Sequence, residues 1–213
     1  MIRSRLFLHS KRSPVLWRCA GNLVGAIGAL YFARAGFSYF RTTHSLVGAI
    51  FLGEQLWVVA AYLVRRPAEL VSQRPIDWLL ATGGTFGGLL FRPEGLHAHL
   101  GVVLGTMLQL LGLTLLMVSF ISLGRSFGFA AGDRGLKSQG AYSVIRHPVY
   151  ASYFLLLSGY VLQSFCLRNL LVMTIVLSCD IGRALAEERF LSTSTNYCEY
   201  SEVVKWRLVP GIW

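Results

Sequence analysis

Residues that could do chemistry gather in one short polar segment between two apolar runs. Arg146, His147 and Tyr150 place a fixed cation, an imidazole that titrates near neutral pH and a phenol close together in the chain. Pro148 suits the first turn of a helix and pushes the residue before it out of the helical region. The sequence therefore predicts that Arg146 and His147 lie at the entry to a helix and that Tyr150 lies on its first turn.

A second polar segment, residues 183–191, lies at the end of the second apolar run after this turn. Its Arg183 and Glu187 are spaced i and i+4, so they share one face of a helix. Arg146 and Arg183 supply cations that could hold a carboxylate. Glu187 and Glu188 supply carboxylates for hydroxyl or amino groups. Tyr142 and Tyr150 offer aromatic faces to a positive centre. This set predicts a zwitterionic, nucleotide-like ligand that carries a sulfonium.

Other kinds of site are disfavoured by the same sequence. It contains no P-loop, no acidic metal cluster and no GxSxG nucleophile motif. The four cysteines are irregularly spaced and form no CxxC pair, which argues against a zinc site and against a disulfide framework. His97 and His99 are spaced i and i+2 and do not share a helix face, so we expect no metal site.

Composition places the chain among integral membrane proteins. Of its 213 residues 54% are hydrophobic and only 14% are charged, and the mean hydropathy is +0.54. Soluble domains carry about 25% charged residues. The net charge of +10 does not indicate nucleic-acid binding, because the basic residues are spread over short loops between apolar runs. These basic residues are instead expected to set the membrane orientation and to contact anionic lipid headgroups. We therefore expect a lipid bilayer, and no nucleic acid, as partner.

Six apolar segments can be drawn, and most approach the ~20 residues that a helix needs to cross a bilayer. They run over residues 15–33, 45–64, 75–91, 96–123, 149–165 and 169–186. The third and fifth are short, so the sequence leaves open whether they span fully. We predict an all-α, polytopic membrane bundle of five to six spans that forms a single domain, 1–213. In it, residues 1–123 form the N-terminal spans and residues 124–213 the catalytic half.

The distribution of lysine and arginine predicts the orientation. With the N-terminus in the cytoplasm, the inner segments carry fifteen of these residues and the outer loops carry four, Arg34, Arg41, Arg92 and Arg168. The fifteen are Arg3, Arg5, Lys11, Arg12, Arg65, Arg66, Arg74, Arg125, Arg134, Lys137, Arg146, Arg183, Arg189, Lys205 and Arg207. Both termini and the 124–147 loop are then cytoplasmic and form a cofactor-binding cap. The aromatic tail, 187–213, is expected to form an interfacial helix that Pro210 and Gly211 stop. Lys205 and Arg207 are expected to contact headgroups.

Two features within the apolar runs have a packing interpretation. The pairs Gly83/Gly87 and Gly84/Gly88 are GxxxG spacings, and we expect them to pack helices within the chain rather than to form a dimer. Glu54 lies within the second run, where we expect it to pair with a polar group or to be protonated.

The polar segments resemble the RHPxY…EExxL…Y..Y signature of the isoprenylcysteine carboxyl methyltransferase family. The residues that carry the resemblance are 146–150, 187–191, Tyr197 and Tyr200. Phospholipid N-methyltransferases share much of this signature. The resemblance covers residues 124–213, and the N-terminal spans match only in hydropathy. In place of the Phe-Gly that the family often shows, this chain has Ser194, Thr195 and Asn196.

The resemblance implies a membrane methyltransferase that uses S-adenosylmethionine without a Rossmann domain. Its cofactor pocket would be lined by Arg134, Gly135, Leu136, Lys137, Tyr142, His147, Pro148, Val149, Tyr150 and Glu187. Arg183 matches an arginine assigned to the substrate, and the residues expected to act in catalysis are Arg146, Arg183 and Glu187. The acceptor implied first is a lipophilic carboxylate, such as a prenylcysteine or an isoprenoid acid.

Several alternatives stay open at this point. The acceptor could be a phospholipid amine or a small thiol. A membrane reductase of the sterol type has a similar C-terminal region and binds NADPH, and a non-enzymatic membrane adaptor would bind neither cofactor. The oligomeric state and the cellular membrane are not indicated by the sequence.

Overall fold

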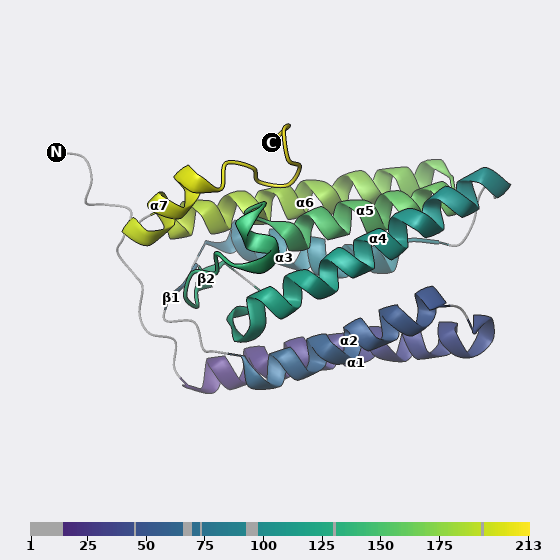
Figure 1. Cartoon of the computed structure of the whole chain (residues 1–213). Coiled ribbons are helices and arrows are strands. Elements are labelled where there is room, and N and C mark those ends of the chain that lie inside the picture. Colours follow the sequence, from purple (N-terminus) through teal and green to yellow (C-terminus); the bar gives the residue numbers. More distant parts are fainter. Residues whose placement is uncertain are drawn as a thin grey trace.

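The computed structural model describes residues 15–44, 46–65, 70–72, 74–92, 98–129, 131–192 and 194–213. Long helices dominate these residues (Figure 1). The α-helices are α1 (Val15–Thr43), α2 (Leu46–Val64), α3 (Pro75–Phe86), α4 (His99–Leu123), α5 (Pro148–Gln163), α6 (Leu167–Leu191) and α7 (Thr195–Val203). The short elements are η1 (Gly87–Leu90), η2 (Gly124–Ser126), η3 (Gly140–Ser143), β1 (Leu70–Val71) and β2 (Gly132–Asp133). The predicted helical class is confirmed, with one small addition, because β1 and β2 pair antiparallel over two residues each.

Some predicted features lie outside the described residues. These are Arg3, Arg5, Lys11, Arg12, Arg66, His97 and the side chain of Glu54. Their predicted roles stay predictions.

The first helix is longer than the sequence predicted. It was expected to end near Ala33, with Arg34 and Arg41 in a loop, but α1 continues to Thr43. No proline interrupts residues 34–43, so the backbone hydrogen bonds of the helix continue unbroken. The helix ends before His44, whose φ of 48° lies in the left-handed region.

Helices α4 and α5 pack closely because each has a glycine at the point where the two helices cross. A Cβ on Gly105 would overlap the carbonyl oxygen of Gly159, and a Cβ on Gly159 would overlap that of Gly105. Residues 164–166 then turn the chain, so that α5 and α6 are antiparallel neighbours. Asn169 is fully buried beside this turn, and its Nδ2 donates to the carbonyl oxygens of Ser164 and Arg92, both at 2.8 Å.

The glycine run of α3 and η1 packs against α6. A Cβ on Gly83 would lie 2.8 Å from Cys179 Sγ, and a Cβ on Gly84 would overlap Asp180. A Cβ on Gly87 would lie 2.5 Å from Val176 Cγ2. The expectation that these glycines pack helices within one chain is therefore confirmed. Gly88 differs, because a Cβ there would meet open space.

Two of the described helical stretches are long and apolar enough to cross a membrane, namely His99–Ser126 and Leu167–Leu191. Only 22% and 33% of their most apolar windows are buried inside the protein, so most of that apolar surface faces outward. Such a surface is compatible with a bilayer. The five to six spans that the sequence predicts go beyond these two helices and stay a prediction.

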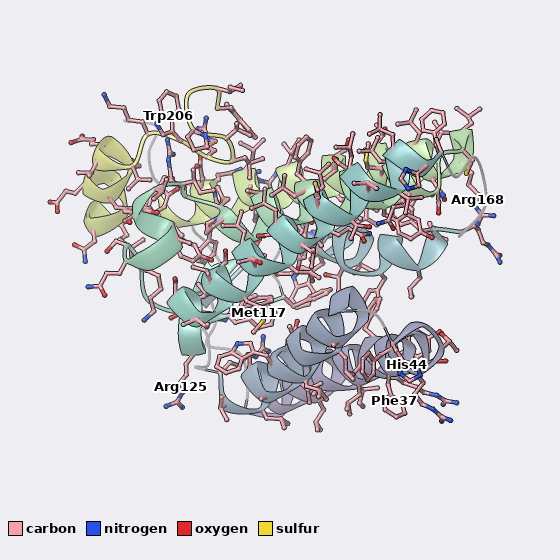
Figure 2. The ribbon with its side chains drawn as sticks, turned by 45° about the vertical axis from the view of Figure 1, so that its right-hand side comes forward. Phe37, His44, Met117, Arg125, Arg168 and Trp206 are labelled. Carbon is pink, nitrogen blue, oxygen red and sulfur yellow. The ribbon has the colours of Figure 1, made fainter. Side chains whose placement is uncertain are left out.

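The loop after α4 and the C-terminal tail lie at the same end of the helices. Figure 2 shows Arg125 and Trp206 toward one end, and Arg168 and His44 toward the other. The backbone N–H of Arg146 donates to the carbonyl oxygen of Trp206 at 2.9 Å. The loop and the tail thus lie at the same end of the helices, whereas their predicted location on the cytoplasmic side of a membrane stays a prediction.

The tail ends its helix earlier than predicted. Helix α7 stops at Val203, well before Pro210 and Gly211, which were expected to stop it. Residues beyond Val203 leave the helix because their carbonyl groups accept hydrogen bonds from the turn before α5. Tertiary pairing thus overrides the helical pattern that continued in the sequence.

Candidate functional site

The polar turn before α5 places His147 at the start of that helix. His147 is the N-cap residue, with φ −129° and ψ 60°, and Pro148 follows in the first turn. Proline is tolerated there because the first N–H groups of a helix have no partner within the helix. His147, Pro148 and Tyr150 are buried, while Val149 is partly exposed. The predicted entry to the helix is confirmed.

Arg146 ties this turn to the tail and to α6. Its Nε donates to the carbonyl oxygen of Val204 and its Nη2 to that of Lys205, both at 2.9 Å. Its Nη1 donates to Glu188 Oε1 at 2.8 Å. All three nitrogen atoms of the guanidinium therefore have partners within the protein. A direct contact between Arg146 and a ligand stays a prediction.

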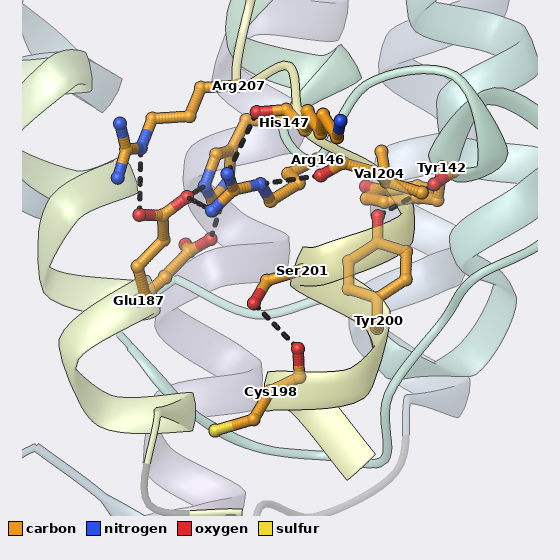
Figure 3. A network of polar contacts seen from close by, with 11 residues as sticks. Tyr142, Arg146, His147, Glu187, Cys198, Tyr200, Ser201, Val204 and Arg207 are labelled. Atoms are coloured by element: carbon orange, nitrogen blue, oxygen red, sulfur yellow. Dashed lines mark hydrogen bonds and ion pairs between the residues drawn. The ribbon is translucent and has the colours of Figure 1, made fainter. Parts of the chain in front are cut away.

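Glu188 is the centre of a charged network. Figure 3 labels three of its members, Arg146, His147 and Arg207. Besides the bond from Arg146, the Glu188 carboxylate accepts a hydrogen bond from Arg207 Nε at 2.8 Å and lies 3.3 Å from His147 Nε2. The Glu188 side chain is only 12% exposed. Glu188 is therefore held within the protein by the turn and the tail, and the ligand role that the sequence predicts for it stays a prediction. Arg207 Nε is bonded to Glu188 and its side chain is 32% exposed, so the expected headgroup contact of Arg207 stays a prediction.

Glu187, the neighbouring carboxylate, has fewer partners and is more open. The hydroxyl group of Tyr150 donates a hydrogen bond to Glu187 Oε1 at 2.5 Å. The other oxygen, Oε2, is 3.8 Å from His147 Nδ1, and the side chain is 31% exposed. The two segments that the sequence singled out therefore meet directly, and Glu187 keeps an oxygen that a ligand could reach.

Arg183 lies one turn further along α6 from Glu187, as the i, i+4 spacing predicts. Its guanidinium is 5.3 Å from the centre of the Tyr150 ring. Nη1 donates to Asp180 Oδ1 and Nη2 to the carbonyl oxygen of Phe129, each at 3.2 Å. The face of Tyr150 that could meet a ligand cation is thus already near a cation of the protein.

The loop after β2 carries four of the predicted cofactor residues. The carbonyl oxygen of Arg134 accepts a hydrogen bond from Ser126 Oγ at 3.0 Å. Gly135 has a φ of +87°, a turn conformation that glycine adopts at low cost. Leu136 is 36% exposed and Lys137 is partly exposed. Their predicted contact with a cofactor stays a prediction.

Tyr142 joins η3 to the tail helix. Its carbonyl oxygen accepts a hydrogen bond from Tyr200 Oη at 2.7 Å. Burial raises the pKa of Tyr142, and the nearby carboxylate of Glu187 raises it further. Burial likewise raises the pKa of Tyr200 above its ordinary value, with a further contribution from Tyr197. Both phenols therefore stay protonated at physiological pH, and Tyr200 stays a hydrogen-bond donor.

The sequence predicted no role for Asp180 and different roles for Glu188 and Arg207. Glu188 was expected to bind a ligand group and Arg207 to contact headgroups, whereas the structure pairs these two residues. The available signal for Asp180 was its position three residues before Arg183, within a run that is otherwise apolar. For Arg207 no local signal exists, because its partner lies in another element.

Comparison with known proteins finds a methyltransferase family model that matches part of the chain. Residues 100–196 match the family model described as phospholipid methyltransferase, a family related to the isoprenylcysteine carboxyl methyltransferases. The match includes α4, α5, α6 and both carboxylates of the site. No curated protein matches the chain. The resemblance drawn from the RHPxY and EExxL segments is confirmed at the level of this family.

Proposed function

We propose, from the premise that residues 100–196 match a membrane methyltransferase family, that this protein transfers a methyl group from S-adenosylmethionine to a lipophilic acceptor. The observation that carries the proposal is the hydrogen bond from Tyr150 to Glu187. It joins the two segments of the methyltransferase signature at one place. The contacts of Arg146 and His147 with Glu188 hold the same two segments together next to this hydrogen bond.

The groups around Glu187 fit the proposed cofactor. S-adenosylmethionine carries an amino group, a carboxylate, ribose hydroxyls and a sulfonium. Glu187 Oε2 can accept a hydrogen bond from an amino or hydroxyl group, and Tyr142 offers an aromatic ring near the same carboxylate. We propose that the remaining walls are Arg134, Gly135, Leu136, Lys137, His147, Pro148, Val149 and Tyr150.

The cofactor would supply a methyl group bound to positively charged sulfur. The lone pair of the acceptor forms a bond to the methyl carbon, while the carbon–sulfur bond breaks and its electron pair stays on sulfur. Correct alignment of the two reactants supplies much of the rate of such a displacement. The residues of this chain then act by holding and orienting. Glu187 would hold the cofactor, Arg146 would fix the RHP turn, and Arg183 would orient the acceptor.

For the acceptor, a lipophilic carboxylate such as a prenylcysteine or an isoprenoid acid is our first candidate. A guanidinium can hold a carboxylate by two parallel hydrogen bonds, and Arg183 lies one turn from Glu187 toward the middle of α6. A phospholipid amine is the second candidate. It is favoured by the description of the matching family and by Asp180, which already pairs with Arg183.

The proposed setting is a multi-pass membrane protein with both termini in the cytoplasm. The soluble cofactor would then enter from the cytoplasmic end, where the loop after α4 meets the tail. The acceptor would approach from the bilayer. The exposed apolar surface of α4 and α6 and the positive-inside charge distribution support this arrangement.

A product-labelling experiment tests the proposal. The purified protein is incubated with methyl-labelled S-adenosylmethionine and a membrane lipid extract, and labelled lipophilic products are sought. We expect labelled product from the wild type and much less from Glu187→Ala when the cofactor is below saturation. In parallel, NADPH is titrated as the cofactor of the rival reductase. Saturable binding of NADPH without any labelled product would replace the proposal with the reductase assignment.

A further inference from the structure

Asp180 is a buried carboxylate beside the residue assigned to the acceptor. It is 2% exposed, and it lies on the same face of α6 as Arg183, with which it is spaced i, i+3. Asp180 Oδ1 accepts a hydrogen bond from Arg183 Nη1 at 3.2 Å. Within the part of the chain that the structure describes, Asp180 Oδ2 is buried and has no hydrogen-bond partner. A buried carboxylate with a free oxygen is costly, so it calls for an explanation.

The surroundings fix both members of this pair. On one side Gly84 of α3 comes so close that a Cβ there would overlap Asp180 Oδ1 and lie 3.2 Å from Arg183 Nη1. On the other side the guanidinium lies over the Tyr150 ring, and its Nη2 is bonded to the carbonyl oxygen of Phe129. Arg183 therefore has one orientation, and the negative charge next to it offsets its positive charge.

Helix packing does not explain the carboxylate. The close approach of α3 and α6 is made possible by Gly84, and a neutral side chain of the same shape would fill the space beside it. Replacing a buried ion pair by apolar residues is often neutral or stabilising, so a buried pair is weak as a source of stability. What the carboxylate changes is the net charge that the pair would present to an acceptor beside Arg183.

We infer that Asp180 is a positioning residue which, through Arg183, sets the charge preference for the methyl acceptor. The inference rests on the proposed methyltransferase function and refines its acceptor end. With Asp180 ionised, the pair has no net charge, so a carboxylate acceptor gains less from Arg183 and an amine acceptor is repelled less. Removing the negative charge should shift the preference toward acids.

A matched pair of probes tests this inference. Hexadecanoic acid and hexadecylamine share one alkyl chain and carry opposite charges at neutral pH. Their affinities for the protein in lipid nanodiscs are measured without cofactor, and their kcat/KM values as acceptors are measured with it. The variant is Asp180→Asn, which keeps the shape and removes the charge. The control is Asp77→Asn, because Asp77 is also buried but bonds to Ser72 and lies 4.0 Å from Arg189.

We expect Asp180→Asn to shift the ratio of acid to amine affinity by roughly tenfold or more toward the acid, as the loss of one nearby charge implies. Asp77→Asn should leave the ratio unchanged. If Asp180→Asn does not fold, Arg183→Gln is compared with Arg183→Gln/Asp180→Asn, which removes both charges. In the Arg183→Gln background we expect Asp180→Asn to shift the ratio little, because Asp180 acts through Arg183, and a shift of about tenfold there would overturn the inference.

The outcomes separate the inference from the function on which it rests. An unchanged ratio in folded Asp180→Asn overturns the role of Asp180, as does an equal loss of affinity for both probes. A wild type that binds S-adenosylmethionine but neither probe also overturns it, while the proposed cofactor stands. A wild type that does not bind S-adenosylmethionine overturns the proposed function, and the inference with it.

Discussion

Arg146 Nη1 donates a 2.8 Å hydrogen bond to Glu188 Oε1, and both side chains are only 12% exposed. The bond joins two polar segments that α5 and most of α6 separate in the sequence. Glu188 also accepts from Arg207, so one carboxylate connects the turn before α5, the end of α6 and the tail. This link leaves Glu187, the adjacent residue, free to face a ligand. The two glutamates thus have different tasks, one structural and one proposed for the cofactor.

Loss of the Glu188 charge should loosen this connection. Glu188→Gln keeps the shape but removes the charge that pairs with Arg146 and Arg207. We expect the free energy of unfolding to fall by about 1–3 kcal/mol, the cost of weakening buried hydrogen bonds to charged groups. The measurement is equilibrium unfolding in mixed micelles. Glu202→Gln serves as the control because Glu202 is exposed on α7. Equal stability of the two variants would count against the structural role of Glu188.

Two glycines of one run should respond differently to alanine. A Cβ on Gly84 would overlap Asp180 Oδ1, whereas a Cβ on Gly88 would meet open space. We expect Gly84→Ala to lower the free energy of unfolding by about 1–3 kcal/mol through overpacking and to reduce kcat/KM for the acceptor. Gly88→Ala should change neither by much. Both quantities are measured on the two variants in parallel, and similar behaviour would show that α3 and α6 pack less closely than described.

The cytoplasmic cap can be tested by thiol labelling. In a background without other cysteines, Gln139→Cys places one thiol in the exposed loop before η3. We expect an impermeant reagent to label it from the cytoplasmic side only, because the inner segments carry most of the basic residues. Leu167→Cys is the control, since Leu167 is 71% exposed and directly precedes Arg168, which lies at the opposite end of the helices (Figure 2). Labelling of residue 139 from the outer side would invert the topology and remove the proposed access of the cofactor.

Arg183 should act on the acceptor rather than on the cofactor. Arg183→Lys keeps the charge but loses the planar fork, which now contacts Asp180 and the carbonyl oxygen of Phe129. We expect kcat/KM for the acceptor to fall at least about tenfold, while the affinity for S-adenosylmethionine stays within a few-fold. Steady-state kinetics with the acceptor varied, together with a cofactor titration, measure both. Collapse of the cofactor affinity would assign Arg183 to the cofactor site instead.

The parts of the fold that local chemistry specifies were predictable. Pro148 indicated the start of α5, and the spacing of Arg183 and Glu187 placed both on one face of α6. The glycine spacings indicated the contact between α3 and α6. Each of these follows from a few adjacent residues, so no tertiary information was needed.

Features that depend on distant partners were not predictable. Helix α7 stops at Val203 because the carbonyl groups beyond it bond to Arg146 and His147. The burial of Glu188 needs Arg207, which lies in a different element. The extension of α1 beyond Ala33 was missed for another reason, because polar residues were taken as a loop although nothing there breaks a helix.

Calorimetric titration with S-adenosylmethionine tests the central claim most directly. The wild type should show saturable binding, and His147→Ala and Glu187→Ala should each weaken it while the protein stays folded. Loss of a hydrogen bond to a charged group costs about 1.5–3 kcal/mol. This cost corresponds to roughly 10- to 150-fold in affinity. Glu202→Gln, in the exposed part of α7, should bind as the wild type does. Absence of saturable binding to the wild type, or unchanged affinity in both alanine variants, would contradict the assignment of this site to the cofactor.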